Sequence, residues 1–323
     1  MKTRLFIILS IFTLWPAFAV AQQPSSSLPS YYIPYHVYDT RQRQWIDLET
    51  MLAAVAQEEV VFLGEQHNDP YAHRLQLAII QGTARRRSNI VLAMEMFERD
   101  VQPALNDYIA GRINETEFLS RSRPWNNYLT DYRPLVEYAR SRGWPVIGGN
   151  APQRLARAVS NHGMNIVEQF SAFDRGLVAE KMECPRDDYW DRFSKVMISI
   201  SASHGGGNAN PHGTATSVEA SPAVSDRIEK LYQAQCLKDE TMAESIAMAL
   251  KEREASKPLV IHVNGDFHSA FGEGTVSRTR RRLPNARIKN VSFIPIKSLD
   301  QISVEEYLKQ GDYLIFTLQE QER

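Results

Sequence analysis

Short runs of β-branched and apolar residues recur at long intervals along the chain, with helical patterns between them. Runs of this kind are typical of strands that are covered on both faces. Strands that alternate with helices favour parallel pairing, because a parallel crossover needs a connection of helix length. The runs therefore predict an α/β fold with a mostly parallel central sheet flanked by helices. They occupy residues 60–63, 90–94, 146–147, 259–263, 291–294 and 313–316.

Helical patterns fill the intervals between these runs. Asp69 followed by Pro70 predicts an N-cap with proline at the first helical position, opening a helix over 69–86. The interval 151–257 carries helical patterns and no convincing strand, which predicts a large helical insertion. Within it, residues 199–225 are rich in Ser, Ala and Gly and predict a mobile surface loop. Further helices are expected over 102–110, 115–121, 133–142, 153–161, 226–254 and 277–283.

The first residues have the pattern of a secretory signal peptide. Lys2 and Arg4 precede an apolar run over 5–15, and the small-x-small triplet 19–21 follows. The run is shorter than the roughly 20 residues that a membrane-spanning helix needs. We therefore expect a signal peptide over 1–21, a flexible leader over 22–36 and one exported, periplasmic domain over 37–323 without a transmembrane segment.

Charge and cysteine content exclude some classes of protein. The 37 Lys and Arg nearly balance the 38 Asp and Glu, so nucleic acid is not expected as a partner. The two cysteines, Cys184 and Cys236, are too few for a disulfide scaffold and lack the spacing of a zinc site. In an oxidising compartment they could pair or stay apart, and the sequence leaves both open.

Polar residues follow four of the predicted strands. Glu65 and His67 follow the first run, Glu95 the second, Asn150 the third and His268 the fourth. Because parallel strands bring their carboxyl ends to one edge of a sheet, these side chains are expected to converge there. Two imidazoles and several carboxylates at one edge fit either a divalent metal site or an acid/base pair.

The remaining polar residues near these strand ends have simpler interpretations. Asp69 and Asn150 are expected to cap helices, and His73 could add a further nitrogen to the cluster. His262 lies inside a strand and is expected to be a core histidine. His204 and His212 flank a glycine run and are expected to be solvated loop residues.

Six sequence blocks, in this order along the chain, resemble the ChaN-like haem-binding uptake family of the Tiki superfamily. The resemblance covers about residues 38–296, and the order of the blocks is more specific than any one of them. The blocks are LGEQH at 63–67, MEMFER at 94–99, YRPL at 132–135, GNAP at 149–152, AQCL with DETMA between 234 and 243, and GDFH at 265–268.

This resemblance implies an exported protein that binds haem and serves iron uptake. It also implies haem held between two subunits of a homodimer, with a tyrosine on the iron and a histidine and a lysine at the propionates. The aromatic segment 125–132 offers Tyr128 and Tyr132 as candidate iron ligands, and the run 280–282 offers arginines for the propionates.

The same superfamily contains metal-dependent hydrolases with a pair of Gly-x-x-His motifs, and this implies an alternative function. The chain has both motifs, at 64–67 and 265–268. In that alternative Glu65, His67, Glu95 and His268 are the catalytic and metal-binding residues, with a glutamate as general base.

Overall fold

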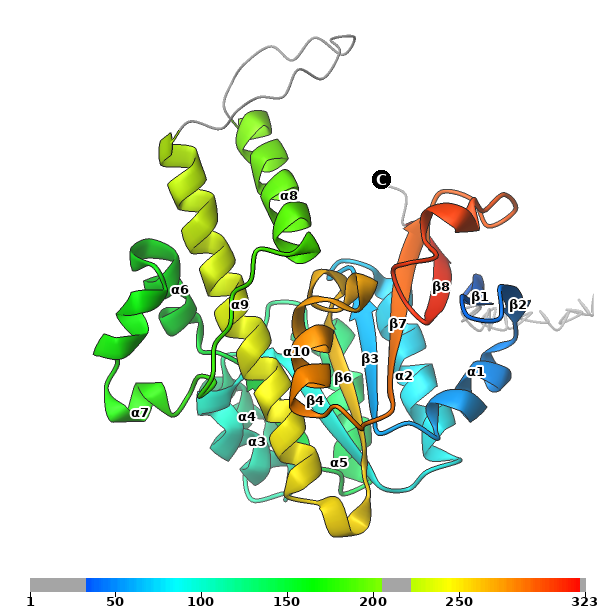
Figure 1. Cartoon of the computed structure of the whole chain (residues 1–323). Coiled ribbons are helices and arrows are strands. Elements are labelled where there is room, and N and C mark those ends of the chain that lie inside the picture. The colour runs from blue at the N-terminus through cyan, green and yellow to red at the C-terminus, as the bar shows by residue number, and fades with distance from the viewer. Residues whose placement is uncertain (1–32, 205–221, 320–323) are drawn as a thin grey trace, which may run out of the picture. The chain divides into compact units, whose positions relative to one another are not determined.

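The computed structural model of the chain describes residues 33–204 and 222–319 (Figure 1). The predicted signal peptide, the leader as far as residue 32, and His212 lie outside the described residues. The architecture is an eight-stranded sheet with helices on both faces, in the order β2-β1-β8-β7-β3-β6-β4-β5. Six neighbouring strands of this order, from β8 to β5, are mutually parallel. The predicted α/β class and mostly parallel sheet are therefore confirmed.

All six predicted strands are present. Most extend by a few residues beyond their apolar runs, into the polar residues at their carboxyl ends. Their bounds are β3 Val60–Glu65, β4 Ile90–Glu98, β5 Val146–Asn150, β6 Leu259–Gly265, β7 Ile288–Ile296 and β8 Tyr313–Leu318.

Two further strands were not predicted. β1 (Tyr35–Asp39) pairs antiparallel with β8, and β2 (Gln44–Ile46) pairs antiparallel with β1 at the edge of the sheet. These strands are short and partly exposed, so they lack the continuous apolar pattern that marks the central strands. Because β1 begins at Tyr35, the last two residues of the stretch expected as leader belong to the sheet.

The predicted helices are also present, and the interval 151–257 is helical as expected. Three helices, α1, α7 and α8, were not predicted individually. Part of the expected loop at 199–204 continues α8 to His204, and residues 205–221 lie outside the described part. The α-helices are α1 Leu48–Val55, α2 Pro70–Ala84, α3 Gln102–Ile109, α4 Glu115–Ser122, α5 Arg133–Ser141, α6 Gln153–His162, α7 Ala172–Arg175, α8 Asp188–His204, α9 Pro222–Lys251 and α10 Gly274–Arg282.

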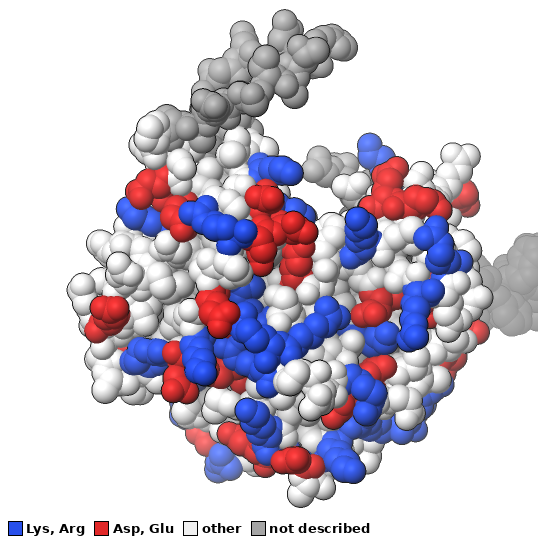
Figure 2. Space-filling view, viewed as in Figure 1, with Lys and Arg blue, Asp and Glu red and all other residues white. Residues whose placement is uncertain are grey.

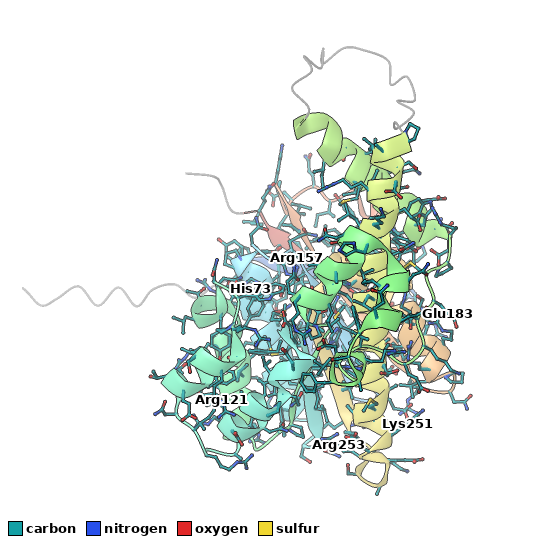
Figure 3. All side chains as sticks on the ribbon, turned by 90° about the vertical axis from the view of Figure 1, so that its left-hand side faces the viewer. His73, Arg121, Arg157, Glu183, Lys251 and Arg253 are labelled. Carbon is teal, nitrogen blue, oxygen red and sulfur yellow. A yellow bond between two sulfur atoms is a disulfide. The ribbon has the colours of Figure 1, made fainter. Side chains whose placement is uncertain are left out.

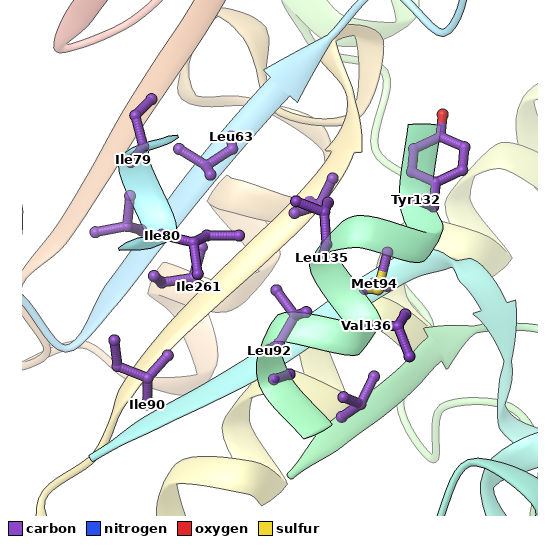
Figure 4. Close-up of a cluster of buried hydrophobic side chains, with 14 of the residues drawn as sticks. Leu63, Ile79, Ile80, Ile90, Leu92, Met94, Tyr132, Leu135, Val136 and Ile261 are labelled. Carbon is purple, nitrogen blue, oxygen red and sulfur yellow. The ribbon is translucent and has the colours of Figure 1, made fainter. Parts of the chain in front are cut away.

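Side chains alternate between two buried layers along the central strands. Val61 and Leu63 of β3 face a large cluster formed with α1, α2, α3 and α5, part of which Figure 4 shows. Val60 and Phe62 face a second cluster under α9 and α10. Burial on both faces explains the apolar runs and fixes the register of the strands.

A disulfide joins Cys184, in the segment before α8, to Cys236 on α9. The pairing that the sequence left open is thus present in the structure. Within residues 33–204 and 222–319, no helix is long and apolar enough to cross a membrane.

Candidate functional site

The four residues expected at the carboxyl edge of the sheet do converge. Glu65 ends β3, Glu95 lies near the end of β4, and His268 ends the short helix η5 (Asp266–His268) that follows β6. His67 follows β3 and lies beside Glu65, with 3.1 Å between Nδ1 and Oε1. The edge therefore carries two acidic groups, each in contact with histidine.

The first group surrounds the buried carboxylate of Glu65. Tyr132 donates to Glu65 Oε1 over 2.5 Å, and Gln76 donates to Oε2 over 2.6 Å. His73 Nε2 lies 3.3 Å from Oε1, and its Nδ1 lies 3.3 Å from Asp131 Oδ2. These donors from α2 and the segment before α5 fix the carboxylate and stabilise its ionised form.

The second group surrounds Glu95 and His268. His268 Nε2 lies 3.3 Å from Glu95 Oε1, and its Nδ1 lies 2.7 Å from Asp239 Oδ1. The backbone N–H of Gly265 donates to Glu95 Oε2 over 2.7 Å. Tyr189 donates to the other oxygen of Asp239 over 2.9 Å. The imidazole of His268 is thus held between two buried carboxylates.

The glycines of the two Gly-x-x-His motifs make room for this arrangement. A Cβ at Gly265 would lie 2.6 Å from His67 Nε2, and a Cβ at Gly64 would lie 2.4 Å from Ser269 Oγ. Because glycine has no Cβ, Gly265 allows the close approach of His67 from the first motif, and Gly64 allows the close approach of Ser269, which follows the second motif. This packing explains why the first position of each motif is glycine.

The charges of these groups depend on one another. Burial alone would raise the pKa of Glu95, but His268, His67 and the Gly265 N–H hold the pKa well below its usual range. Burial alone would lower the pKa of His268, but Glu95 and Asp239 raise it to about 10. The net pKa shifts are downward for Glu65 and upward for His67 and His73. Carboxylates and imidazolium groups therefore neutralise one another.

The structure does not support the expected divalent metal site at Glu65, His67, Glu95 and His268. No group of three or more His, Cys, Asp or Glu side chains in the described part of the chain is arranged to hold a metal ion. Instead, carboxylates lie against the imidazoles of His67 and His268 and raise their pKa values. The metal-dependent hydrolase alternative is therefore not favoured.

The two tyrosines expected as iron ligands are both buried. Tyr128 is 1% exposed, packs edge-on against Phe97, and has no hydrogen-bond partner for its hydroxyl among the described residues. Tyr132 is fully buried, and its hydroxyl is engaged by Glu65. Burial raises the pKa of both phenols. Neither hydroxyl is presented to a ligand at the surface, so their burial does not support this choice of residues.

Of three other residues that were assigned a role from the sequence, two have that role in the structure and one does not. Asp69 caps α2 as expected, accepting from the N–H groups of Tyr71 and Ala72. Asn150 does not cap α6, whose N-cap is Pro152, and instead donates to the Glu95 carbonyl over 3.1 Å. His262 is a core histidine, fully buried in β6, and burial lowers its pKa to about 4.

Three arginines of α10 contact one buried carboxylate of α9. Arg281 and Arg282 form ion pairs with Glu240 of α9, whose side chain is fully buried, and Arg278 lies 3.3 Å from the same carboxylate. Their charge is therefore used to join α10 to α9. Two of the three arginines in the run 280–282 are thus paired within the chain, and the expectation that this run supplies propionate cations stays a prediction.

Sequence reasoning missed the site residues contributed by α8 and α9. Asp239 and Gln235 both contact His268, and Tyr189 contacts both of them. The DETMA block contains Asp239 and drew attention to this region, but no local pattern shows that α9 crosses the carboxyl edge of the sheet.

A cleft of about 300 Å³ opens beside His268, between α6, α8 and α9. Gln235 lies between the cleft and His268, since it lines the cleft and its amide nitrogen lies 3.2 Å from His268 Nδ1. Arg157 and Lys238 also line the cleft, and neither side chain has an ion pair or hydrogen bond to another described residue. Its apolar wall is formed by Ala156, Phe193, Leu231 and Ala234.

The family model described as "Haem-binding uptake, Tiki superfamily, ChaN" matches residues 51–279. A curated relative, Protein RETICULATA-RELATED 5, chloroplastic, of Arabidopsis thaliana, is 26% identical over 78% of this chain. The match spans only 32% of that plant protein.

Among solved structures, ChaN of Campylobacter jejuni, described as binding haem cofacially, has a TM-score of 0.60 and 17% identity. The match covers 88% of this chain and 97% of that one. A succinoglycan biosynthesis protein has a TM-score of 0.46 and 12% identity, over 84% and 90% of the two chains. The ChaN likeness shows a shared fold, and the family model matches well over half of the chain. The chain therefore belongs to the ChaN-type haem-binding uptake family of the Tiki superfamily.

Proposed function

We propose that this chain is an exported haem-binding protein that serves haem uptake, and that haem binds at the cleft between α6, α8 and α9. The family match over residues 51–279 is the observation that carries the haem assignment. The export part rests on the signal-peptide pattern of residues 1–21. A homodimer, as the sequence resemblance implies, remains part of the proposal.

The cleft offers two of the features that a haem site needs, an apolar wall and cations. Haem is a flat apolar macrocycle with two carboxylate groups, so a binding surface needs an apolar wall and cations. Phe193 and Leu231 supply apolar contact, and Arg157 and Lys238 supply two positive charges without described partners. Arg157 and Lys238 would therefore hold the two carboxylates, and the apolar wall would contact the macrocycle.

Haemin titration followed by absorption tests this proposal. The purified chain should bind haemin saturably, and Arg157→Gln and Lys238→Gln should each weaken binding by roughly tenfold, since a hydrogen bond to a charged group contributes about 1.5–3 kcal/mol. Lys309→Gln is the matched control, because Lys309 is exposed and lies outside the cleft. Equal affinity in all three variants would contradict the proposed position of haem.

The export and dimer parts are tested separately. Cell fractionation should place the chain in the periplasm, and sedimentation velocity with and without haemin should show a dimer. A chain found only in the cytoplasm would contradict export without affecting the haem assignment.

A further inference from the structure

A larger cavity lies at the opposite, amino-terminal edge of the sheet. It is lined by residues that come just before β3, β4, β6 and β7, together with the end of α9, and has a volume of about 740 Å³. This lies within the range of small-molecule sites, about 300–1,000 Å³. Nothing in the haem proposal uses it.

Three cationic side chains without an ion pair to another described residue line this cavity. The guanidinium of Arg87 donates to the carbonyl oxygens of Ala56, Glu58 and Lys257, and to no carboxylate. Lys251 and Lys257 also line the cavity, and their ammonium groups have no ion pair or hydrogen bond within the described residues. Three positive charges are therefore left without a described counter-ion.

The other charged groups of the lining do not cancel this excess. The guanidinium of Arg287 forms an ion pair with the carboxylate of Glu59, with 3.4 Å between Nη1 and Oε2. Glu254 is one further carboxylate without a described ion pair. Burial and the positive charge of Arg287 lower the pKa of Arg87, and the nearby carboxylate of Glu59 offsets part of this effect.

The cavity also has an apolar side. Leu250 and Leu283 line it and pack against the core cluster between the sheet and α9. A neighbouring cavity of about 500 Å³ shares Lys251 and Arg282 with it and continues along α9 and α10. Figure 2 shows Lys and Arg side chains gathered over these two helices. Cations thus stand beside an apolar wall.

We propose that this cavity binds an amphiphilic organic phosphate, with the phosphate at Arg87, Lys251 and Lys257 and the apolar portion against Leu250 and Leu283. A phosphate group carries up to two negative charges and several strong acceptor oxygens, so it matches three cations of one lining better than one carboxylate does. Leucine contacts favour a ligand with an acyl or similar chain over a bare phosphate.

This site is distinct from the cleft proposed for haem. Lys238 of that cleft and Lys251 of this cavity lie on the same helix, α9, and 13 residues at 1.5 Å per residue separate them by about 20 Å. Figure 3 shows Arg157 and Lys251 at different heights of the molecule. Variants of one site should therefore leave the other intact.

Calorimetric titration of the purified chain with dioctanoyl phosphatidate, below its critical micelle concentration, tests the inference. Glycerol 3-phosphate serves as the phosphate without chains. We expect saturable phosphatidate binding, weaker binding of glycerol 3-phosphate, and a loss of roughly tenfold or more in phosphatidate affinity in Lys251→Gln/Lys257→Gln. Lys309→Gln is the matched control, and haemin binding should be unchanged in the double variant.

Four results would overturn the inference. Absence of saturable binding, or equal phosphatidate affinity in the double variant, would remove the site. Equal affinity for the two probes would show that no apolar portion is recognised. Loss of haemin binding in the folded double variant would show that this cavity is the haem site.

Discussion

Replacing His268 with glutamine should strongly destabilise the fold, because this imidazole lies between two buried carboxylates. Its nitrogens lie 3.3 Å from Glu95 Oε1 and 2.7 Å from Asp239 Oδ1. Each contact to a charged partner contributes about 1.5–3 kcal/mol. Removing one partner of a buried ion pair costs about 3–5 kcal/mol, because an unpaired charge remains. We therefore expect a free energy of unfolding about 3–5 kcal/mol below wild type at pH 7.

The same geometry predicts a pH dependence with a definite sign. The pKa of His268 is raised from 6.5 to about 10 in the folded chain, so its stabilisation is complete below pH 6.5 and is lost progressively as the pH rises to 10. The pKa of Glu95 is lowered, so its stabilisation is present above pH 4.5 and is lost as the pH falls below that value. The contribution of this pair should therefore be largest between about pH 4.5 and 6.5.

Urea unfolding followed by circular dichroism measures these effects. His162→Gln is the matched control, since His162 is exposed at the end of α6. Glu95→Gln/His268→Gln should lose less stability than the sum of the two single variants, because the remaining uncompensated charge is smaller. Two results would refute a stabilising Glu95–His268 pair. One is a free energy of unfolding in His268→Gln that lies less than about 1 kcal/mol below wild type, and the other is a wild-type free energy of unfolding that does not change between pH 6.5 and 10.

Three further predictions follow from burial, the disulfide and the amino-terminal pattern. Tyr128→Phe and Tyr132→Phe should leave the absorption spectrum of the haemin complex unchanged, since both hydroxyls are buried; a changed spectrum in a folded variant would restore that tyrosine as an iron ligand. Cys184→Ser/Cys236→Ser should unfold at lower urea concentration, with a loss of about 4 kcal/mol for a cross-link spanning 52 residues; an unchanged midpoint would contradict a disulfide in the native protein. Intact-mass measurement of exported protein should give Gln22 as the first residue, and retention of residues 5–15 would contradict the signal peptide.

Much of the fold could be predicted because the central strands are buried on both faces. Burial produces the apolar runs, so all six parallel strands were found, whereas β1 and β2 were missed because edge strands are short and partly exposed. The helix α8 was not predicted. One reason is that its carboxyl-terminal residues are rich in Ser, a residue that favours turns and helix caps.

Only those residues of the candidate site that lie at or just after the strand ends could be predicted. Glu65, Glu95 and His268 follow directly from parallel strands, whose carboxyl ends share one edge. Asp239 and Gln235 could not be predicted, because their position depends on the path of α9 across that edge. That no group of described residues is arranged to hold a metal could not be predicted either, because the relative positions of these side chains depend on three-dimensional contacts.

The structure of the chain with haem bound tests the central claim most directly. The account predicts the macrocycle between α6, α8 and α9, with its carboxylates at Arg157 and Lys238 and its face against Phe193 and Leu231. Haem at the amino-terminal cavity beside Lys251 and Lys257, or at any surface that leaves Arg157 and Lys238 free, would contradict it.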